Sequence, residues 1–422
     1  MSDIVSFYTQ QAQKALSSLP WLEQVQLQAL KNLERRGFPS RHHEEWKYTS
    51  VDALLKQTFS NVEAQNPKHE LLHSDLPVAN QLLIHNGQIA AENNLLAKLP
   101  KGVLVLSLSV ALAEHSELIK PYLAHILEQE HGFHALNTAL IGCGIVIYIP
   151  KGVCVDTPIV LNHFQDQEMH AVHLRHLIIA EQGSQATIIE DYRGVEGCTY
   201  FTNTVSELFV GPSAHLTHYK IQRESKMAFH LGHIAVKQGA HSHLASHSIN
   251  LGAALARSDM SIRLQEEHAH CLMNGIYAPT EGQHVDHHTT VYHLVPNCSS
   301  EQDYKGILKG RSRAVFNGKV IVAKDAQHSN AQQQNKNLLL SANAEINTKP
   351  QLEIFADDVI CSHGATVGQL DEDALFYLAT RGIDRLEASQ YLIHAFAEDN
   401  LRLIPNRELA DWMSHLLIQQ LG

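Results

Sequence analysis

A cysteine and a histidine in the C-terminal part of the sequence, Cys361 and His363, could together bind a metal ion or handle sulfur. They stand two residues apart and follow a strand-like run that ends in two acids. On a strand the thiol and the imidazole lie on the same face, because side chains alternate along the chain. A thiolate beside an imidazole can ligate iron or zinc. A packed thiol beside an ordinary surface histidine gives the same pattern, so the pair by itself does not define a site.

A second group of candidate ligands lies upstream, at His284, Asp286 and His288, with His293 beyond. On a strand the first three share one face, and imidazoles with a carboxylate suit zinc or iron. Histidine is nevertheless abundant throughout the chain, at 30 of 422 residues, and it recurs nearby at positions 241, 243, 268 and 270. Such a spread favours a polar ladder on a solvated face over one dedicated metal centre.

Motifs for nucleotide and serine chemistry fail in this sequence. Gly318-Lys319 follows a plausible strand, but Arg313 and Val320 stand where a P-loop needs glycine and Ser or Thr. Gly142 and Gly144 lack the third glycine of a dinucleotide fingerprint, and no G-x-S-x-G string occurs. The sequence therefore gives no support for ATP hydrolysis or serine hydrolysis by this chain.

The composition is that of a globular protein with an acidic surplus. Lys and Arg total 32 against 44 Asp and Glu, which gives a formal charge of −12. This sign argues against binding to nucleic acid or to an anionic membrane, and no run of about 18 apolar residues predicts a membrane span. The 6 cysteines form no C-x-x-C pair, and the N-terminus has no signal-peptide pattern. We therefore expect a soluble cytoplasmic protein with free thiols.

Helical patterns frame the sequence at both ends. Residues 1–80 predict an N-terminal helical domain, in which the apolar periodicity stops at Gly37. Residues 371–422 predict a C-terminal helical domain, with an apolar stripe that runs from Leu409 to Leu421. That stripe is expected either to bury itself within a small bundle or to dock a partner.

Residues 81–370 predict a β-rich core, with a mixed α/β entry region over 81–140. Segments that begin at Gly183, Gly211 and Gly239 are equally spaced along the chain, and each continues with a small residue and a strand-like run. A fixed period in this range is typical of stacked units. Units made of strands stack into a β-helix or rolled β-solenoid. The sequence therefore predicts a mainly β protein with a solenoid core between two helical domains.

Residues 300–382 contain several ordered and highly specific strings. The upstream ones are Ser300-Glu-Gln-Asp-Tyr-Lys-Gly306 and Gln334-Asn-Lys-Asn-Leu-Leu-Leu-Ser341. The downstream ones are Lys349-Pro-Gln-Leu-Glu-Ile-Phe-Ala-Asp-Asp-Val359 and Cys361-Ser-His-Gly-Ala-Thr-Val-Gly-Gln-Leu-Asp371. Near the N-terminus stand Arg41 and Glu45-Trp-Lys-Tyr-Thr49. Together these strings resemble the SufB/SufD family of iron–sulfur cluster assembly proteins, and the Cys-Ser-His string is closer to the SufD members than to the SufB members.

The resemblance implies a right-handed parallel β-helix and a stable complex with SufB and the ATPase SufC. The β-helix would pair with SufB. SufC would bind the C-terminal helices, around Leu375, Phe376, Leu386 and Phe396.

The same resemblance implies a site at the SufB interface. His363 matches the family histidine expected to face SufB where a cluster is assembled, and Cys361 lies beside it. The chain is then a scaffold and not an enzyme, which agrees with its lack of a P-loop. No permanently bound cofactor is expected, because iron, sulfur or a nascent cluster would be held only transiently, with His363 as the metal ligand.

A stand-alone metalloenzyme is the competing hypothesis, built on a β-solenoid or cupin-like barrel with His284, Asp286 and His288 as ligands. It predicts stoichiometric zinc or iron in the isolated chain. A structural partner of SufB without any ligand of its own is a third. The sequence leaves open whether iron, sulfur or a finished cluster contacts His363. It also leaves open whether a homodimer forms without SufB.

Overall fold

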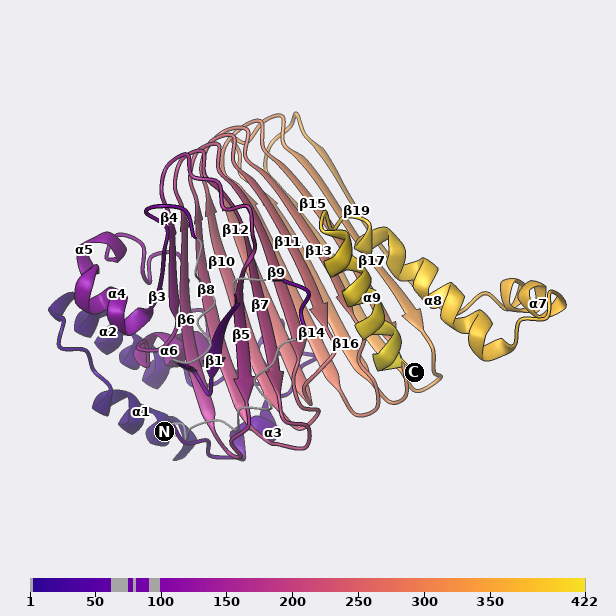
Figure 1. Cartoon of the computed structure of the whole chain (residues 1–422), viewed down its shortest axis with the longest axis horizontal. Helices are drawn as coiled ribbons and strands as arrows, with labels where there is room; N and C mark the ends of the chain where they lie inside the picture. The colour runs from indigo at the N-terminus through magenta and orange to yellow at the C-terminus, as the bar shows by residue number, and fades with distance from the viewer. Residues whose placement is uncertain (1–2, 62–74, 79–80, 91–98, 422) are drawn as a thin grey trace.

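The computed structural model describes residues 3–61, 75–78, 81–90 and 99–421 of the chain. Its centre is a parallel β-solenoid, in which consecutive strands from β4 (Ile145–Ile149) onward alternate between two sheets (Figure 1). Helices precede and follow the solenoid along the chain. The prediction of a mainly β protein with a solenoid core and helical ends is therefore confirmed.

Strands of the solenoid stack in register within two sheets. The first sheet, taken from its last strand back, contains β19 (Ile360–Gly368), β17 (Asn330–Leu339), β15 (Ser299–Leu308), β13 (His270–Tyr277), β11 (His243–Asn250), β9 (His215–Arg223), β7 (Gln185–Gly194), β5 (Ile159–Gln165), β1 (Gln81–His85) and β2 (Gln88–Ile89). The second sheet contains β18 (Glu345–Ile354), β16 (Arg313–Val322), β14 (His284–His293), β12 (Leu255–Leu264), β10 (Phe229–Gln238), β8 (Phe201–Val210), β6 (Ala171–Ala180), β4 and β3 (Leu104–Ser107). Among the described residues, only β1 with β2 and β3 with β4 pair antiparallel.

The six turns between β6 and β17 that connect the two sheets in the same direction each contain a small, fully buried residue. The turns that lead from the second sheet into the first place this residue directly after one with positive φ. The small residues are Ser184, Ala214, Ser242, Ala269, Cys298 and Ser329. The residues before them are Gly183, Ser213, His241, His268, Asn297 and His328. Tight left-handed turns of this kind leave little room for a larger side chain at the buried position.

The pairing of the strands shows that the repeat length is not constant, although the equal spacing of Gly183, Gly211 and Gly239 suggests that it is. Gly211 and Gly239 do occupy equivalent positions, because each stands four positions before the first residue of its strand, in β9 and β11, and these two residues are ladder partners. Gly183 stands only two positions before the first residue of β7, which pairs with the first residue of β9. The ladder therefore makes Ser213, and not Gly211, the counterpart of Gly183. Coils vary in length while the strands keep their in-register stacking.

N-terminal helices cover the outer face of the second sheet. They are α1 (Asp3–Lys14), α2 (Pro20–Arg36), the 3-10 helix η1 (Glu44–Trp46), α3 (Asp52–Leu55), α4 (Leu108–Glu114), α5 (Ser116–Ile119) and α6 (Gly132–Ala139). Trp46 and Phe133 pack against a row of outward side chains on the sheet, namely Ala171, Phe201, Phe229 and Leu255. As the sequence predicts, α2 ends at Gly37, whose φ is 63° and whose N–H donates to the Leu33 carbonyl at 2.8 Å.

The helices after the last strand are α7 (Glu372–Thr380), α8 (Arg385–Leu401) and α9 (Arg407–Leu421). α9 and the C-terminal half of α8 lie against the first sheet, whereas the first half of α8 and α7 project away from the solenoid (Figure 1). Met413 and Leu417 of α9 share a buried cluster with Tyr219 and Ile249 of the sheet. The apolar stripe over 409–421 therefore docks on the solenoid itself, which is neither of its two expected locations. No helix among the described residues is long and apolar enough to cross a membrane.

Enlarging a residue of the small buried column is expected to destabilise the solenoid. Ala214→Leu forces a larger side chain into a fully buried position, and overpacking costs about 1–3 kcal/mol. His215→Leu, at the adjacent exposed position, is the matched control and should change the free energy of unfolding by less than about 0.5 kcal/mol. Urea denaturation followed by circular dichroism measures both. Equal unfolding midpoints for the two variants would contradict a tightly packed column.

Candidate functional site

His363 lies on β19, the terminal strand of the first sheet, at the open end of the solenoid. Among the described residues, β19 pairs with β17 on one side only. The ladder places His363 at the end of a column of buried residues, which runs back through Gln333, Gln302, Met273, Ser246 and His218. His363 itself is exposed. It therefore occupies an inward-facing position that the next coil would cover if there were one.

Cys361 shares this inward face, as its spacing from His363 predicts. It is half-buried and packs with the cluster that contains Val320 and Ala331. Burial raises the pKa of the Cys361 thiol. The thiol is therefore protonated at neutral pH, and a protonated thiol is a weak nucleophile and ligand until a cation or metal ion displaces its proton. The strand brings the two candidate residues together, but only His363 is exposed.

Polar side chains buried inside the solenoid were missed by sequence reasoning. The carboxylate of Glu190 accepts hydrogen bonds from the hydroxyls of Tyr192 at 2.6 Å and Ser206 at 2.7 Å. His218 Nε2 lies 3.0 Å from the same carboxylate. Burial acts to raise the pKa of Glu190, but the hydrogen bond and charge of His218 outweigh it and hold the pKa well below its usual range. The interior thus contains an ionised carboxylate beside an imidazole.

Amide side chains continue this polar interior toward the open end. Gln333 donates from Nε2 to Oε1 of Gln302 at 3.1 Å, and the Thr289 hydroxyl donates to the same oxygen at 2.7 Å. Gln333 is the direct ladder neighbour of His363. The sequence could not reveal these residues, because alternation along a strand shows two faces without showing which one is inward.

The upstream group, His284, Asp286 and His288, shares the outward face of β14, as its spacing predicts. Residues 41–49, called here the N-terminal segment, cover it. Thr49 donates to Asp286 Oδ2 at 2.6 Å, and its hydroxyl lies 2.9 Å from His284 Nε2. His288 stands between two carboxylates, with Nε2 2.9 Å from Asp286 and Nδ1 3.3 Å from Glu45. These contacts hold the N-terminal segment against the solenoid.

This group is an ion-pair network and not an open set of metal ligands. Burial and Arg257 act to lower the pKa of His288, but Asp286 and Glu45 outweigh them and raise it to about 9. His288 is therefore protonated at neutral pH, and a protonated imidazole has no lone pair for a metal ion. Arg257 adds a second cation that donates to Asp286 at 2.9 Å. The geometry therefore does not support the metal centre of the competing hypothesis.

The four C-terminal residues expected to bind a partner differ in exposure. Phe376 on α7 is 72% exposed and Leu386 on α8 is 65% exposed. Leu375 is buried, and Phe396 packs against the cluster that joins the C-terminal helices to the first sheet. Leu375 and Phe396 therefore hold the helices in place and do not present a surface. Tyr377, which the sequence did not single out, is exposed beside Phe376.

The sequence contains a further histidine pattern that is not among the candidate sites above, the H-E-x-x-H string His69-Glu-Leu-Leu-His73. Two histidines at this spacing on one face of a helix bind zinc in metalloproteases. The string lies outside the described residues, so no role is assigned to it.

Removing the hydroxyl of Thr49 is expected to loosen the N-terminal segment. Thr49→Val keeps the shape of the side chain but removes the donor to the Asp286 carboxylate, and a hydrogen bond to a charged group contributes about 1.5–3 kcal/mol. Thr49→Ser keeps the donor and is the matched control. Free energies of unfolding and the rate of proteolysis near the N-terminus measure the effect. Wild-type stability for the valine variant would show that the network does not hold the segment.

Comparison with known proteins gives consistent matches along the chain. The family described as "SUF system FeS cluster assembly, SufBD core domain" matches residues 163–396, and "SufBD protein N-terminal region" matches residues 2–161. An iron–sulfur cluster assembly SufBD family protein of Synechocystis sp. is 35% identical over 382 residues, which cover 87% of this chain and 84% of the relative.

Two relatives named SufD are also similar to this chain. The iron–sulfur cluster assembly protein SufD of Escherichia coli is 32% identical over 378 residues, which cover 88% of this chain and 86% of the relative. SufD of Bacillus subtilis is 26% identical over 402 residues, which cover 91% and 90%. Since the core-domain match alone spans more than half of the sequence, the chain belongs to the SufBD family of iron–sulfur cluster assembly proteins.

Proposed function

We propose that this chain is a SufD-type scaffold subunit that builds iron–sulfur clusters together with SufB and SufC. Its similarity to relatives named SufD supports the subunit type. The position of His363 carries the proposal: an inward-facing residue at the open end of a solenoid, exposed where a further coil would cover it. A partner solenoid docked end to end would enclose His363 between the two chains.

The open end has the features of a surface that pairs with another chain. Both sheets terminate there, in β18 and β19. A terminal strand presents one row of backbone groups to which another strand can add. Apolar side chains at this end are unusually exposed, with Ile360 at 70%, Phe355 at 63% and Val367 at 50%. We infer that SufB pairs here, and that a second copy of this chain can take the same place when SufB is absent.

Iron, sulfur or a nascent cluster would be bound only transiently at this interface. Imidazole and thiolate groups are common ligands of iron and of iron–sulfur clusters. His363, with Cys361 beside it, would hold iron, sulfur or a nascent cluster together with groups of SufB. An incoming metal ion would displace the proton of the Cys361 thiol. The chain itself catalyses no reaction in this proposal, ATP hydrolysis takes place on SufC, and the assembly works in the cytoplasm.

SufC is proposed to bind the projecting C-terminal helices. Phe376 and Tyr377 on α7 and Leu386 on α8 are apolar side chains that remain largely exposed in the described part of the chain. α7 stands clear of the solenoid (Figure 1), so a partner can approach it without meeting the core.

The role of His363 is tested in the complete complex. His363→Ala should leave co-purification with SufB and SufC intact but slow cluster formation at least about tenfold, since even the residues that only orient a metal ligand contribute that much. Ser362→Ala, on the opposite face of the same strand, is the matched control and should behave as wild type. Cluster formation is followed by visible absorption under anaerobic conditions. An intact complex with full activity in the His363 variant would reduce this chain to a structural partner.

The proposed SufC-binding surface is tested by replacing exposed apolar residues of α7 and α8 with polar ones. The double variant Phe376→Ser, Leu386→Ser should weaken SufC binding at least about tenfold, because exposed apolar residues at the centre of an interface often contribute more than about 1 kcal/mol each. Met227→Ser removes another exposed apolar side chain, 52% exposed and far along the chain, and should not change the affinity. Isothermal titration calorimetry gives both dissociation constants. Unchanged SufC affinity with lost SufB binding would show that this surface serves the other partner.

A further inference from the structure

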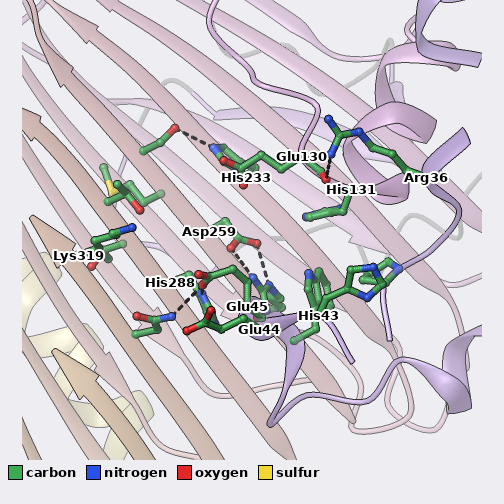
Figure 2. A pocket seen from close by; sticks show the side chains of 18 of the residues that line it. Arg36, His43, Glu44, Glu45, Glu130, His131, His233, Asp259, His288 and Lys319 are labelled. Atoms are coloured by element: carbon green, nitrogen blue, oxygen red, sulfur yellow. Dashed lines mark hydrogen bonds and ion pairs between the residues drawn. The ribbon is translucent and has the colours of Figure 1, made fainter. Parts of the chain in front are cut away.

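A cavity of about 490 Å³ lies between the N-terminal segment and the outer face of the second sheet. Figure 2 shows side chains from both sides that gather around it: Glu130 and His131 from the segment before α6, and Asp259 and His288 from β12 and β14. The cavity adjoins the ion-pair network around Asp286. Most of the residues that line it have polar or charged side chains, so it can accept a polar ligand or an ion.

His131 lines this cavity but takes no part in the ion-pair network. It directly precedes the first turn of α6. Both of its ring nitrogens are buried, and neither has a hydrogen-bond partner among the described residues. Buried polar groups in native proteins almost always have a partner, and an exception points to a bound water, ion or ligand.

His134 and Asp259 complete a group with His131 in which the candidate ligand atoms all lie within 4.8 Å of one another. Two atoms bound to one zinc ion at about 2.1 Å are at most about 4.2 Å apart, so small side-chain rotations bring all three onto one ion. His134 Nδ1 lies 3.2 Å from the carbonyl oxygen of Glu128. A backbone carbonyl in this position is the usual partner that orients a metal-binding imidazole.

The carboxylates around the group favour a cation. Asp259 is paired with Arg257 through two hydrogen bonds of 2.9 and 3.0 Å, and its carboxylate oxygens retain further lone pairs for a metal ion. Glu130 and Glu45 also line the cavity. Lys319, a cation on the same wall, is paired with a glutamate of the neighbouring strand at 2.7 Å. Arg257 and His288, the cations beside Asp259, are also paired with carboxylates, so a cation bound by Asp259 would still meet further carboxylates nearby, which attract it.

We propose that His131, His134 and Asp259 form a binding site for one divalent first-row transition metal ion, Fe²⁺ or Zn²⁺. Two imidazoles and one carboxylate are the ligand set of many iron(II) sites and of catalytic zinc sites, and they leave positions open toward the cavity. His233, whose Nδ1 lies 3.0 Å from His134 Nε2, stands within reach as a further ligand. The site goes beyond the proposed function, because it lies on the outer face of β12 and not at the open end that holds His363.

The site is tested on the full-length chain with Co²⁺ as the spectroscopic probe, followed by competition with Fe²⁺ under anaerobic conditions and with Zn²⁺. Wild type should bind one ion per chain, with the visible spectrum of nitrogen and oxygen ligation. His131→Ala and Asp259→Asn should each weaken binding at least about tenfold. His43→Ala, which removes a histidine that lines the same cavity but lies outside the ligand group, should bind as wild type. The competition shows whether Fe²⁺ or Zn²⁺ is held more tightly.

Three results would overturn the proposal. They are the absence of binding by the wild-type chain at millimolar Co²⁺, an unchanged Co²⁺ spectrum in both ligand variants, or a sulfur-to-cobalt charge-transfer band that places the ion on a cysteine. Circular dichroism confirms that each variant is folded. His131→Ala is the decisive variant if Asp259→Asn unfolds, since the His131 ring makes no hydrogen bond that the substitution could remove within the described part of the chain.

Discussion

In-register stacking of parallel strands is the constraint on which the rest of this structure depends. Each strand residue meets its counterpart in the coils before and after it, so a whole column of residues shares one environment. The small buried residues of the turns form one such column. A second column faces the interior of the solenoid and runs along it from His218 to His363 at the open end. A third, on the outer face of the second sheet, places His233, Asp259 and His288 side by side.

Stacking also leaves unpaired backbone groups at the two ends of the solenoid, because a terminal coil has a neighbour on one side only. Toward the N-terminus, the parallel ladders give way to the antiparallel strands β2 and β3. Toward the C-terminus, β18 and β19 are the last strands, and α9 and the C-terminal half of α8 pack on the face of the first sheet (Figure 1). Exposed apolar side chains and His363 therefore remain at this end, and an end of this kind can pair with another chain.

The N-terminal segment is held by buried charge. Asp286, His288 and Arg257 lie under it with Glu45, and each charged group has at least one partner of opposite sign. Buried ion pairs gain little net stability after desolvation, but removal of one partner is costly. The network therefore fixes the position of the segment, and with it the walls of the cavity where His131 faces Asp259. Two candidate metal sites of different character thus arise from the same fold, one at the open end and one beneath the N-terminal segment.

The sequence by itself determined the fold class, the helical ends and the sharing of one face by Cys361 and His363. These features follow from helical and strand periodicity, which is a property of neighbouring residues. Only the tertiary structure decided the varying coil lengths, the inward or outward direction of each face, and the docking of the 409–421 stripe on the solenoid. It alone showed that His288 is an ion-pair partner and that His131 meets Asp259. Those outcomes depend on contacts between residues far apart in the chain, and local periodicity carries no information about such contacts.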